Sequence, residues 1–235
     1  NATIAAYGDI NTAGIVFLEA TAGDLGIESK HGSIVLSNGT VAKAGRDLIV
    51  AALENDVRFN GGALEAGQDI QISAEGRLYS RATLQAGRDV DIYAYEEVIL
   101  NGTITATTGK VEIYAETGEL EVHAPITAAT NIALETEDDR IDINAKLTAT
   151  GVTLTSEKGD ILSSDTGVVE AATIKANTGG KVDLDGKLLA SAWVDIEAIG
   201  SVTAADIESG VVKVKTTGSN ADIDINLTAG STDLV

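Results

Sequence analysis

The sequence contains no cysteine, no methionine and a single proline, Pro125, and aromatic residues make up only 3% of its 235 residues. The absence of cysteine excludes disulfide bonds, thiolate metal ligands and a cysteine nucleophile. Because large rings are scarce, the core has to be built from Val, Ile, Leu and Ala. Such a core suits a regular stack of thin layers better than a compact globule.

Basic residues are also scarce, with 16 Lys and Arg beside 36 Asp and Glu and a formal net charge of −20 at pH 7. Phosphates would be repelled by this charge, so nucleic acid is excluded as a partner and anionic membranes are disfavoured. No signal peptide and no apolar run of membrane-spanning length is visible. We expect a mature segment of a longer protein.

The sequence contains internal repeats along most of its length. The phrases AGRDLIV at 44–50, AGQDIQI at 66–72 and AGRDVDI at 86–92 are nearly the same. The first inward-facing apolar residue after each phrase belongs to a series with a period of about 20–21 residues. Its members are Ile4, Leu25, Leu48, Ile70, Val90, Val111, Ile132, Val152, Ile174, Val194 and Val212. No linker interrupts this series, which predicts one domain over 1–235.

Within each unit the apolar residues alternate with a period of two, as in Leu48 and Val50 followed by Val57 and Phe59. This alternation is typical of β-strands, and each unit holds three of them. A helical solenoid would need a 3.6-residue rhythm, and the leucine-rich-repeat spacing is absent. The pattern predicts an all-β parallel β-helix (β-solenoid) of about eleven coils with three short strands per coil. Its least regular part is expected at 155–181.

Turn residues recur at two corners of the predicted coil. Glycine precedes the first strand, and Asn followed by Gly comes after the second strand. The residues of these two columns are Gly45, Gly67, Gly87, Asn38, Asn60 and Asn101. Asn and Gly both tolerate φ > 0, so we expect them to form the turns. Stacked Asn amides are also expected to hydrogen-bond from coil to coil.

A column of carboxylates accompanies the first corner, where Asp47, Asp69 and Asp89 occupy the same position in three consecutive coils. Such a row could bind Ca²⁺, which prefers several oxygen ligands. Alternatively, each Asp caps its own turn by accepting backbone N–H bonds. We favour the capping role, because the Gly-Gly-x-Gly-x-Asp motif of calcium-binding β-rolls is absent. No cofactor is expected.

Two tyrosines, Tyr93 and Tyr114, occupy equivalent outward positions on adjacent predicted coils. An exposed aromatic pair of this kind can bind sugar rings or another protein. The alternative is a cross-strand ladder that only stiffens the sheet. Both interpretations stay open from the sequence.

Catalysis finds little support in the sequence. Carboxylate pairs such as Asp91 and Glu112 could serve glycoside chemistry, but clusters of this kind are expected by chance in a chain with 36 acidic residues. The predicted turns are short, whereas a substrate cleft would need long loops. We therefore expect the chain not to be an enzyme.

The amino-acid sequence of the repeats resembles that of a known family. AGRDLIVAALENDVRFNGGALEAGQDIQISAEGRLYSRATLQAGRDVDIYA is similar to the haemagglutinin-type repeat of filamentous haemagglutinin, a repeat found in exoproteins of two-partner secretion, including adhesins and contact-dependent inhibition toxins. The similarity rests on Ala-Gly-x-Asp-hydrophobic-x-hydrophobic followed by a Gly-Xaa-Leu strand, and it is clear over 44–105. It implies a right-handed β-helix, export through an outer-membrane transporter partner, and secretion to the surface of a Gram-negative cell. The Asn-Pro motifs of the family's secretion domain are missing, so we expect an internal shaft segment.

These observations predict a structural and adhesive rod segment of a large surface exoprotein, which spaces or presents a binding or toxic part. Its partner would be a receptor or glycan on a host or neighbouring cell. Two alternatives stay open: a carbohydrate-active β-helix, either a polysaccharide lyase or a hydrolase, and a polymerising matrix or filament subunit. Because end coils expose pairable strand edges, end-to-end self-association is also expected.

Overall fold

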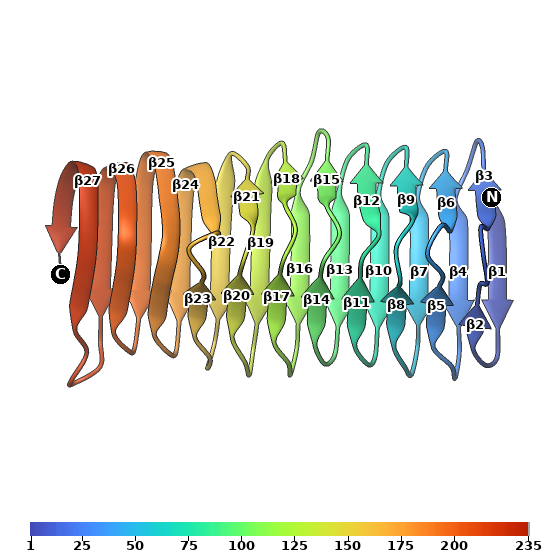
Figure 1. Cartoon of the computed structure of the whole chain (residues 1–235), viewed down its shortest axis with the longest axis horizontal. Helices are drawn as coiled ribbons and strands as arrows, with labels where there is room; N and C mark the ends of the chain where they lie inside the picture. Colours follow the sequence, from blue (N-terminus) through green and yellow to red (C-terminus); the bar gives the residue numbers. More distant parts are fainter. Residues whose placement is uncertain (235) are drawn as a thin grey trace.

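The computed structural model describes the backbone of residues 1–234 and the side chains of residues 1–228. Strands make up all of its regular structure, and no helix is present in residues 1–234. The chain winds into about eleven stacked coils, with the N-terminus at one end of the stack and the C-terminus at the other (Figure 1). The predicted parallel β-helix is confirmed.

Each coil crosses three sides of the stack, which we call face 1, face 2 and face 3 in chain order. The short strands of face 1 are β1 (Ala2–Ala6), β4 (Leu25–Ser29), β7 (Leu48–Ala52), β10 (Ile70–Ala74), β13 (Val90–Ala94), β16 (Val111–Ala115), β19 (Asn131–Thr136) and β22 (Gly151–Ser156). The short strands of face 2 are β2 (Ile10–Asn11), β5 (Ile34–Leu36), β8 (Val57–Phe59), β11 (Leu78–Ser80), β14 (Val98–Leu100), β17 (Leu120–Val122), β20 (Ile141–Ile143) and β23 (Ile161–Ser163). The short strands of face 3 are β3 (Phe17–Ala20), β6 (Val41–Ala44), β9 (Ala63–Ala66), β12 (Thr83–Ala86), β15 (Ile104–Ala106), β18 (Ile126–Ala128) and β21 (Lys146–Thr148).

The last coils are built from longer strands that continue around the corners. These are β24 (Val168–Thr178), β25 (Val182–Ala198), β26 (Val202–Thr216) and β27 (Ile223–Leu234). The first part of β24 pairs with β21 on face 3 and the second part with β22 on face 1. Register shifts mark the bends, for example between Ala171 and Thr173. The change from short to long strands falls within 155–181.

Stacked rows of aliphatic side chains form the core. Every strand pairs in parallel with its equivalent in the adjacent coils, as β10 does with β7 and β13. The row from Leu25 to Val212 follows the predicted series, and none of its members is more than 1% exposed. At the N-terminus the series is wrong, because Ala2 rather than Ile4 lies over Leu25 and Ile4 pairs with Ile27. Both positions point inward, so alternation alone does not distinguish these registers.

The corner glycines are needed for space rather than for a left-handed backbone. Positive φ occurs in the described residues only at Gly14, Gly39, Gly61 and Gly62, so the expectation is wrong for Gly45, Gly67 and Gly87. Instead, a Cβ on Gly87 would lie 2.1 Å from the carbonyl oxygen of Gly67, and one on Gly67 would lie 2.2 Å from that of Gly45. Consecutive coils approach so closely at this corner that a side chain has no room.

The Asn–Gly corner differs from the prediction in a similar way. Gly39 and Gly61 have φ of 89° and 138°, but no Asn has positive φ. The expected ladder of Asn amides is also wrong. Arg81 lies between Asn60 and Asn101 in the stack, because its N–H bonds to Phe59 while the Asn101 N–H bonds to Ser80. Asn60 and Asn101 therefore lie two coils apart, and although Asn38 and Asn60 follow strands of adjacent coils, no hydrogen bond joins their amides in residues 1–228.

Candidate functional site

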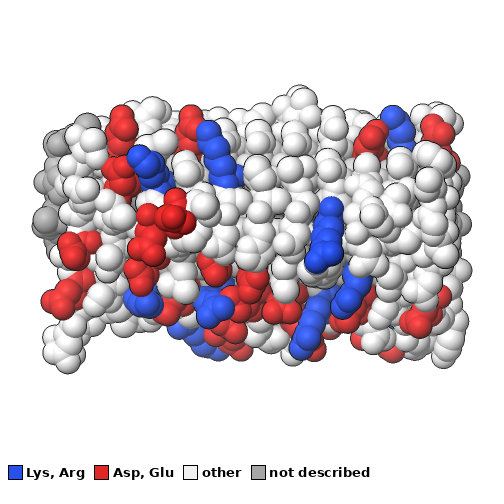
Figure 2. All heavy atoms as spheres, in the orientation of Figure 1, with Lys and Arg blue, Asp and Glu red and all other residues white. Residues whose placement is uncertain are grey.

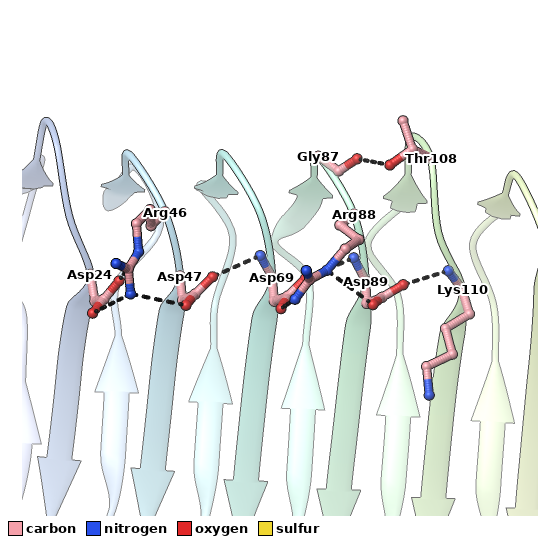
Figure 3. Close-up of polar contacts among 9 residues, drawn as sticks. All are labelled: Asp24, Arg46, Asp47, Asp69, Gly87, Arg88, Asp89, Thr108 and Lys110. Atoms are coloured by element: carbon pink, nitrogen blue, oxygen red, sulfur yellow. Dashed lines mark hydrogen bonds and ion pairs between the residues drawn. The ribbon is translucent and has the colours of Figure 1, made fainter.

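The aspartate column forms a continuous row along the corner where face 3 passes into face 1 (Figure 3). Each carboxylate accepts the backbone N–H of the equivalent residue in the next coil. Asp47 accepts from Asp69 at 3.3 Å, and Asp69 accepts from Asp89 at 3.2 Å. Asp89 accepts from Lys110 at 2.9 Å. Asp therefore caps the turn of the following coil rather than its own turn.

Arginines complete this row. The Arg88 guanidinium donates to both oxygens of Asp69, with Nε at 2.8 Å from Oδ1, and its Nε lies 3.3 Å from Asp89. Arg46 pairs in the same way with Asp24, at 3.0 Å. Asp24 precedes Leu25 as Asp47 precedes Leu48, so the column starts one coil before the predicted residues. Asp24 was not predicted from the sequence, because its segment AGDL at 22–25 lacks the residue that separates Gly from Asp in the three later repeats.

Three aspartates on non-consecutive coils make the same kind of contact at the corner between face 1 and face 2. The Asp9 carboxylate accepts the N–H of Ser33, Asp56 accepts that of Arg77, and Asp160 accepts that of Lys181, each at 2.8 Å. Side-chain acceptors thus join successive coils at two of the three corners. The carboxylates of Asp47, Asp69 and Asp89 are occupied by these contacts, and residues 1–228 contain no group of three His, Asp or Glu side chains placed to hold a metal ion.

The two predicted tyrosines lie side by side on face 1. Tyr93 and Tyr114 are register partners on β13 and β16, with ring centroids 5.8 Å apart and an interplanar angle of 29°. The Tyr93 hydroxyl donates to Oε2 of Glu116 at 2.7 Å. Tyr114 repeats this bond with Glu137. Each ring is therefore held toward the following coil by a glutamate of the next turn.

A shallow open groove of about 660 Å³ surrounds this pair, built from outward side chains of β7, β10, β13, β16 and β19. Two rows run through it. One row contains Ser73, Tyr93 and Tyr114, and the parallel row contains Asp91 and Glu112. Ile49, which is 40% exposed, lies at its N-terminal end. The groove combines an apolar surface with carboxylates.

The charges of the groove are unbalanced. Its one ammonium group, on Lys110, is already paired with Glu112 at 2.6 Å. Burial raises the pKa of the Asp91 carboxyl, the nearby Lys110 ammonium opposes this effect more weakly, and Glu112 adds to it. The hydrogen bond to Glu116, followed by burial, raises the pKa of Tyr93 to about 12. Burial and the bond to Glu137 likewise raise the pKa of Tyr114. The glutamate partners and Lys110 were not predicted from the sequence, although Tyr and Glu recur together 23 residues apart.

Comparison of the chain with protein families, curated protein sequences and solved structures gives no match. The fold defines the class directly: the chain is a parallel β-helix whose coils are joined by backbone ladders on three faces and by aspartates at two corners. Residues 1–234 contain no helix that is long and apolar enough to span a membrane.

Proposed function

We propose that the chain is a rod segment of a large secreted bacterial surface protein, where it spaces a binding or toxic part from the cell and offers its faces for adhesion. The observation that carries this proposal is the continuous parallel pairing of coil with coil from β1 to β27. The resemblance of residues 44–105 to haemagglutinin-type repeats supports the secreted location and a transporter partner.

Rigidity follows from the way adjacent coils are connected. Each coil is bonded to the next along all three faces, so bending the rod would break many bonds together. Most ion pairs also link adjacent coils, such as Lys43 with Glu65 at 2.9 Å and Lys215 with Glu197 at 2.7 Å. In Figure 2 basic side chains accordingly lie beside acidic ones, while acidic residues are in excess. Repulsion between acidic rods would keep them apart laterally.

A height measurement tests the spacer role. The chain is anchored to a surface through a C-terminal tag and carries a fluorophore on a cysteine introduced at the exposed Tyr7, in the first coil. We expect the fluorophore to stand on the order of 50 Å above the anchor, because about eleven coils rise by ~4.8 Å each. A broad or much smaller height distribution would contradict the spacer role.

A screen for polysaccharide cleavage tests the proposed absence of catalysis. Acidic and neutral polysaccharides are incubated with the purified chain, with and without Ca²⁺, and new reducing ends and unsaturated products are measured. We expect no turnover above that of heat-treated protein. Cleavage that copurifies with the chain would replace the structural role with a carbohydrate-active one.

A further inference from the structure

We infer that the groove around Tyr93 binds an arginine side chain presented by an extended basic segment of a partner protein. The inference deepens the proposed function, because it rests on the rod offering its faces for adhesion and names one face and one class of partner. The guanidinium would stack on the Tyr93 ring and pair with the Asp91 carboxylate. Three features of the groove support this assignment.

The first feature is the space beside Tyr93. Its hydroxyl is bonded to Glu116 in the following coil, so the ring leans toward the C-terminal end and stacks on Tyr114. On its other side the register places Ser73, followed by Ala51. These short side chains leave room for a flat group against the ring. Ser73 and Tyr93 both line the groove at this position.

The second feature is the charge around this space. Five carboxylates lie in or beside the groove, and they belong to Asp91, Glu112, Glu116, Glu135 and Glu137. Lys110 is the only cation lining it, and it is paired with Glu112. No ion pair or hydrogen bond of the Asp91 carboxylate occurs among the described residues, although the side chain is half-buried. The Lys110 ammonium, held by Glu112, acts on Asp91 at longer range than an ion pair, so a cation from outside would find a carboxylate without an ion pair two residues from the aromatic ring.

The third feature is that the chain uses this chemistry internally on face 2. The guanidinium carbons of Arg58 and Arg81 lie 5.7 Å and 5.3 Å from the centroid of the Tyr79 ring. On face 1 no Lys or Arg of residues 1–228 lies over Tyr93 or Tyr114. Arginine fits the site better than lysine, because a planar guanidinium stacks on a ring and donates two parallel bonds to one carboxylate.

The partner segment is extended for a geometric reason. Side chains of adjacent coils in one row are separated by ~4.8 Å along the rod. Ile49 lies two coils from Asp91 in the same row, about 9.6 Å along the rod. Residues i and i+2 of an extended peptide are about 7 Å apart on the same side of the chain, so a side chain at i+2 that is directed along the rod can reach the exposed Ile49 at the N-terminal end of the groove. A segment with an arginine at position i and an apolar residue at position i+2 presents both side chains on one side and matches this surface in charge and shape.

Calorimetric titration with short peptides tests the inference on the full 235-residue chain. The probe is an acetylated peptide of repeated Arg-Ser-Val-Ser, which places Arg and Val on the same side of an extended chain, and its control carries citrulline, a neutral isostere, in place of Arg. We expect the Arg peptide to bind at least tenfold more tightly than the citrulline peptide, and a Lys peptide to bind with intermediate affinity. Raising NaCl from 50 to 500 mM should weaken binding of the Arg peptide to the chain, because the Debye length falls from more than ~10 Å to less than ~8 Å.

Matched variants locate the site. Asp91→Asn should weaken binding about tenfold, as expected for loss of a charge-assisted bond. Ser73→Tyr should abolish binding while keeping Tyr93, because the new ring extends the stacked row into the space beside Tyr93. Asp142→Asn removes the same charge from a half-buried outward position of face 2 and should leave binding unchanged. Thermal unfolding of each variant checks that the rod is intact.

Three outcomes would overturn the inference. The first is equal affinity for the Arg and citrulline peptides, and the second is no binding at millimolar peptide. The third is binding of a neutral oligosaccharide at these tyrosines that Asp91→Asn does not weaken, which would assign the groove to glycans. A rod of the expected height with no peptide binding would refute this inference alone and leave the spacer role standing.

Discussion

The Tyr93 hydroxyl donates to Oε2 of Glu116 at 2.7 Å, and Glu116 belongs to the turn that follows the next strand of face 1. The bond therefore joins two coils through side chains alone. Tyr114 and Glu137 repeat it one coil further. Together with the stacking of the two rings, this arrangement holds the aromatic pair in one orientation on an otherwise flat face. The stability of this region and the proposed arginine site both depend on it.

The first prediction concerns alkaline pH. Folding raises the pKa of Tyr93 from 10.0 to about 12, so its contribution to stability is fully present below pH 10 and is lost as the pH rises to 12. Tyr93→Phe should be about 1 kcal/mol less stable than the wild type at pH 8. This difference should shrink between pH 10 and 12 in urea unfolding followed by circular dichroism. Tyr7→Phe, at a tyrosine that is 75% exposed, is the control and should show no such trend.

The second prediction concerns the unpaired carboxylate. Folding raises the pKa of Asp91 above its ordinary 3.8, chiefly through burial, so the ionised form opposes folding at neutral pH. Asp91→Asn should therefore raise the urea midpoint at pH 7, and the gain should disappear below pH 3.8, where the carboxyl is protonated in both states. A variant that is less stable than the wild type at pH 7 would show that Asp91 has a stabilising partner.

Much of the fold could be predicted from the sequence, because a solenoid repeats one local pattern. The alternation of apolar residues identifies the strands, and the period aligns them from Leu25 to Val212. The register at the N-terminus could not be predicted, since Ala2 and Ile4 both point inward and only stacking decides between them. The period of the apolar residues therefore predicts which residues are buried. It predicts less well which residues of adjacent coils contact each other.

The corners and the groove show what the pattern does not contain. Gly87 was assigned to the right corner for the wrong reason, because the distance to the Gly67 carbonyl depends on how coils stack. Similarly, Tyr93 and Tyr114 could be paired from the period, but their bonds to glutamates and the unpaired state of Asp91 depend on side-chain directions. Contacts between coils join residues about 20 positions apart, beyond the reach of local sequence rules.

The third prediction tests the close approach of coils. Gly87→Ala should destabilise the rod by about 2–3 kcal/mol, because the added methyl group would meet the Gly67 carbonyl oxygen and the coils would have to separate. Gly8→Ala is the matched control, because nothing lies within 4 Å of its added methyl group and its φ is not positive. The control should stay within about 0.5 kcal/mol of the wild type in urea unfolding. Equal effects of both substitutions would contradict the crowding of this corner.

The fourth prediction separates capping from calcium binding. Asp69→Ala should cost about 2 kcal/mol, because it leaves the Asp89 N–H without its acceptor and the Arg88 guanidinium with only its longer contact to Asp89. Asp165→Ala, at an exposed turn residue, should cost less than about 0.5 kcal/mol. Thermal unfolding of the wild type should be the same with millimolar calcium chloride and with a chelator. A calcium-dependent rise in Tm that Asp69→Ala removes would show that the row holds the ion instead.

The most direct measurement of the rod itself is a distance between two spin labels. Glu28 and Lys215 belong to the same outward row of face 1, and the equivalent residues Ala51, Ser73, Tyr93, Tyr114, Glu135, Thr155, Asn177 and Glu197 lie between them. The chain has no native cysteine, so Glu28→Cys and Lys215→Cys give two unique labelling sites.

Pulsed electron double resonance on this doubly labelled chain should give one narrow distribution near 43 Å, because nine steps of ~4.8 Å separate the labels. Deleting residues 48–69, which joins Asp47 to Ile70 in the phrase AGRDIQI, removes one coil and should shorten the distance by about 5 Å without broadening it. A broad distribution, or a distance that does not change with the deletion, would contradict a rigid rod of stacked coils.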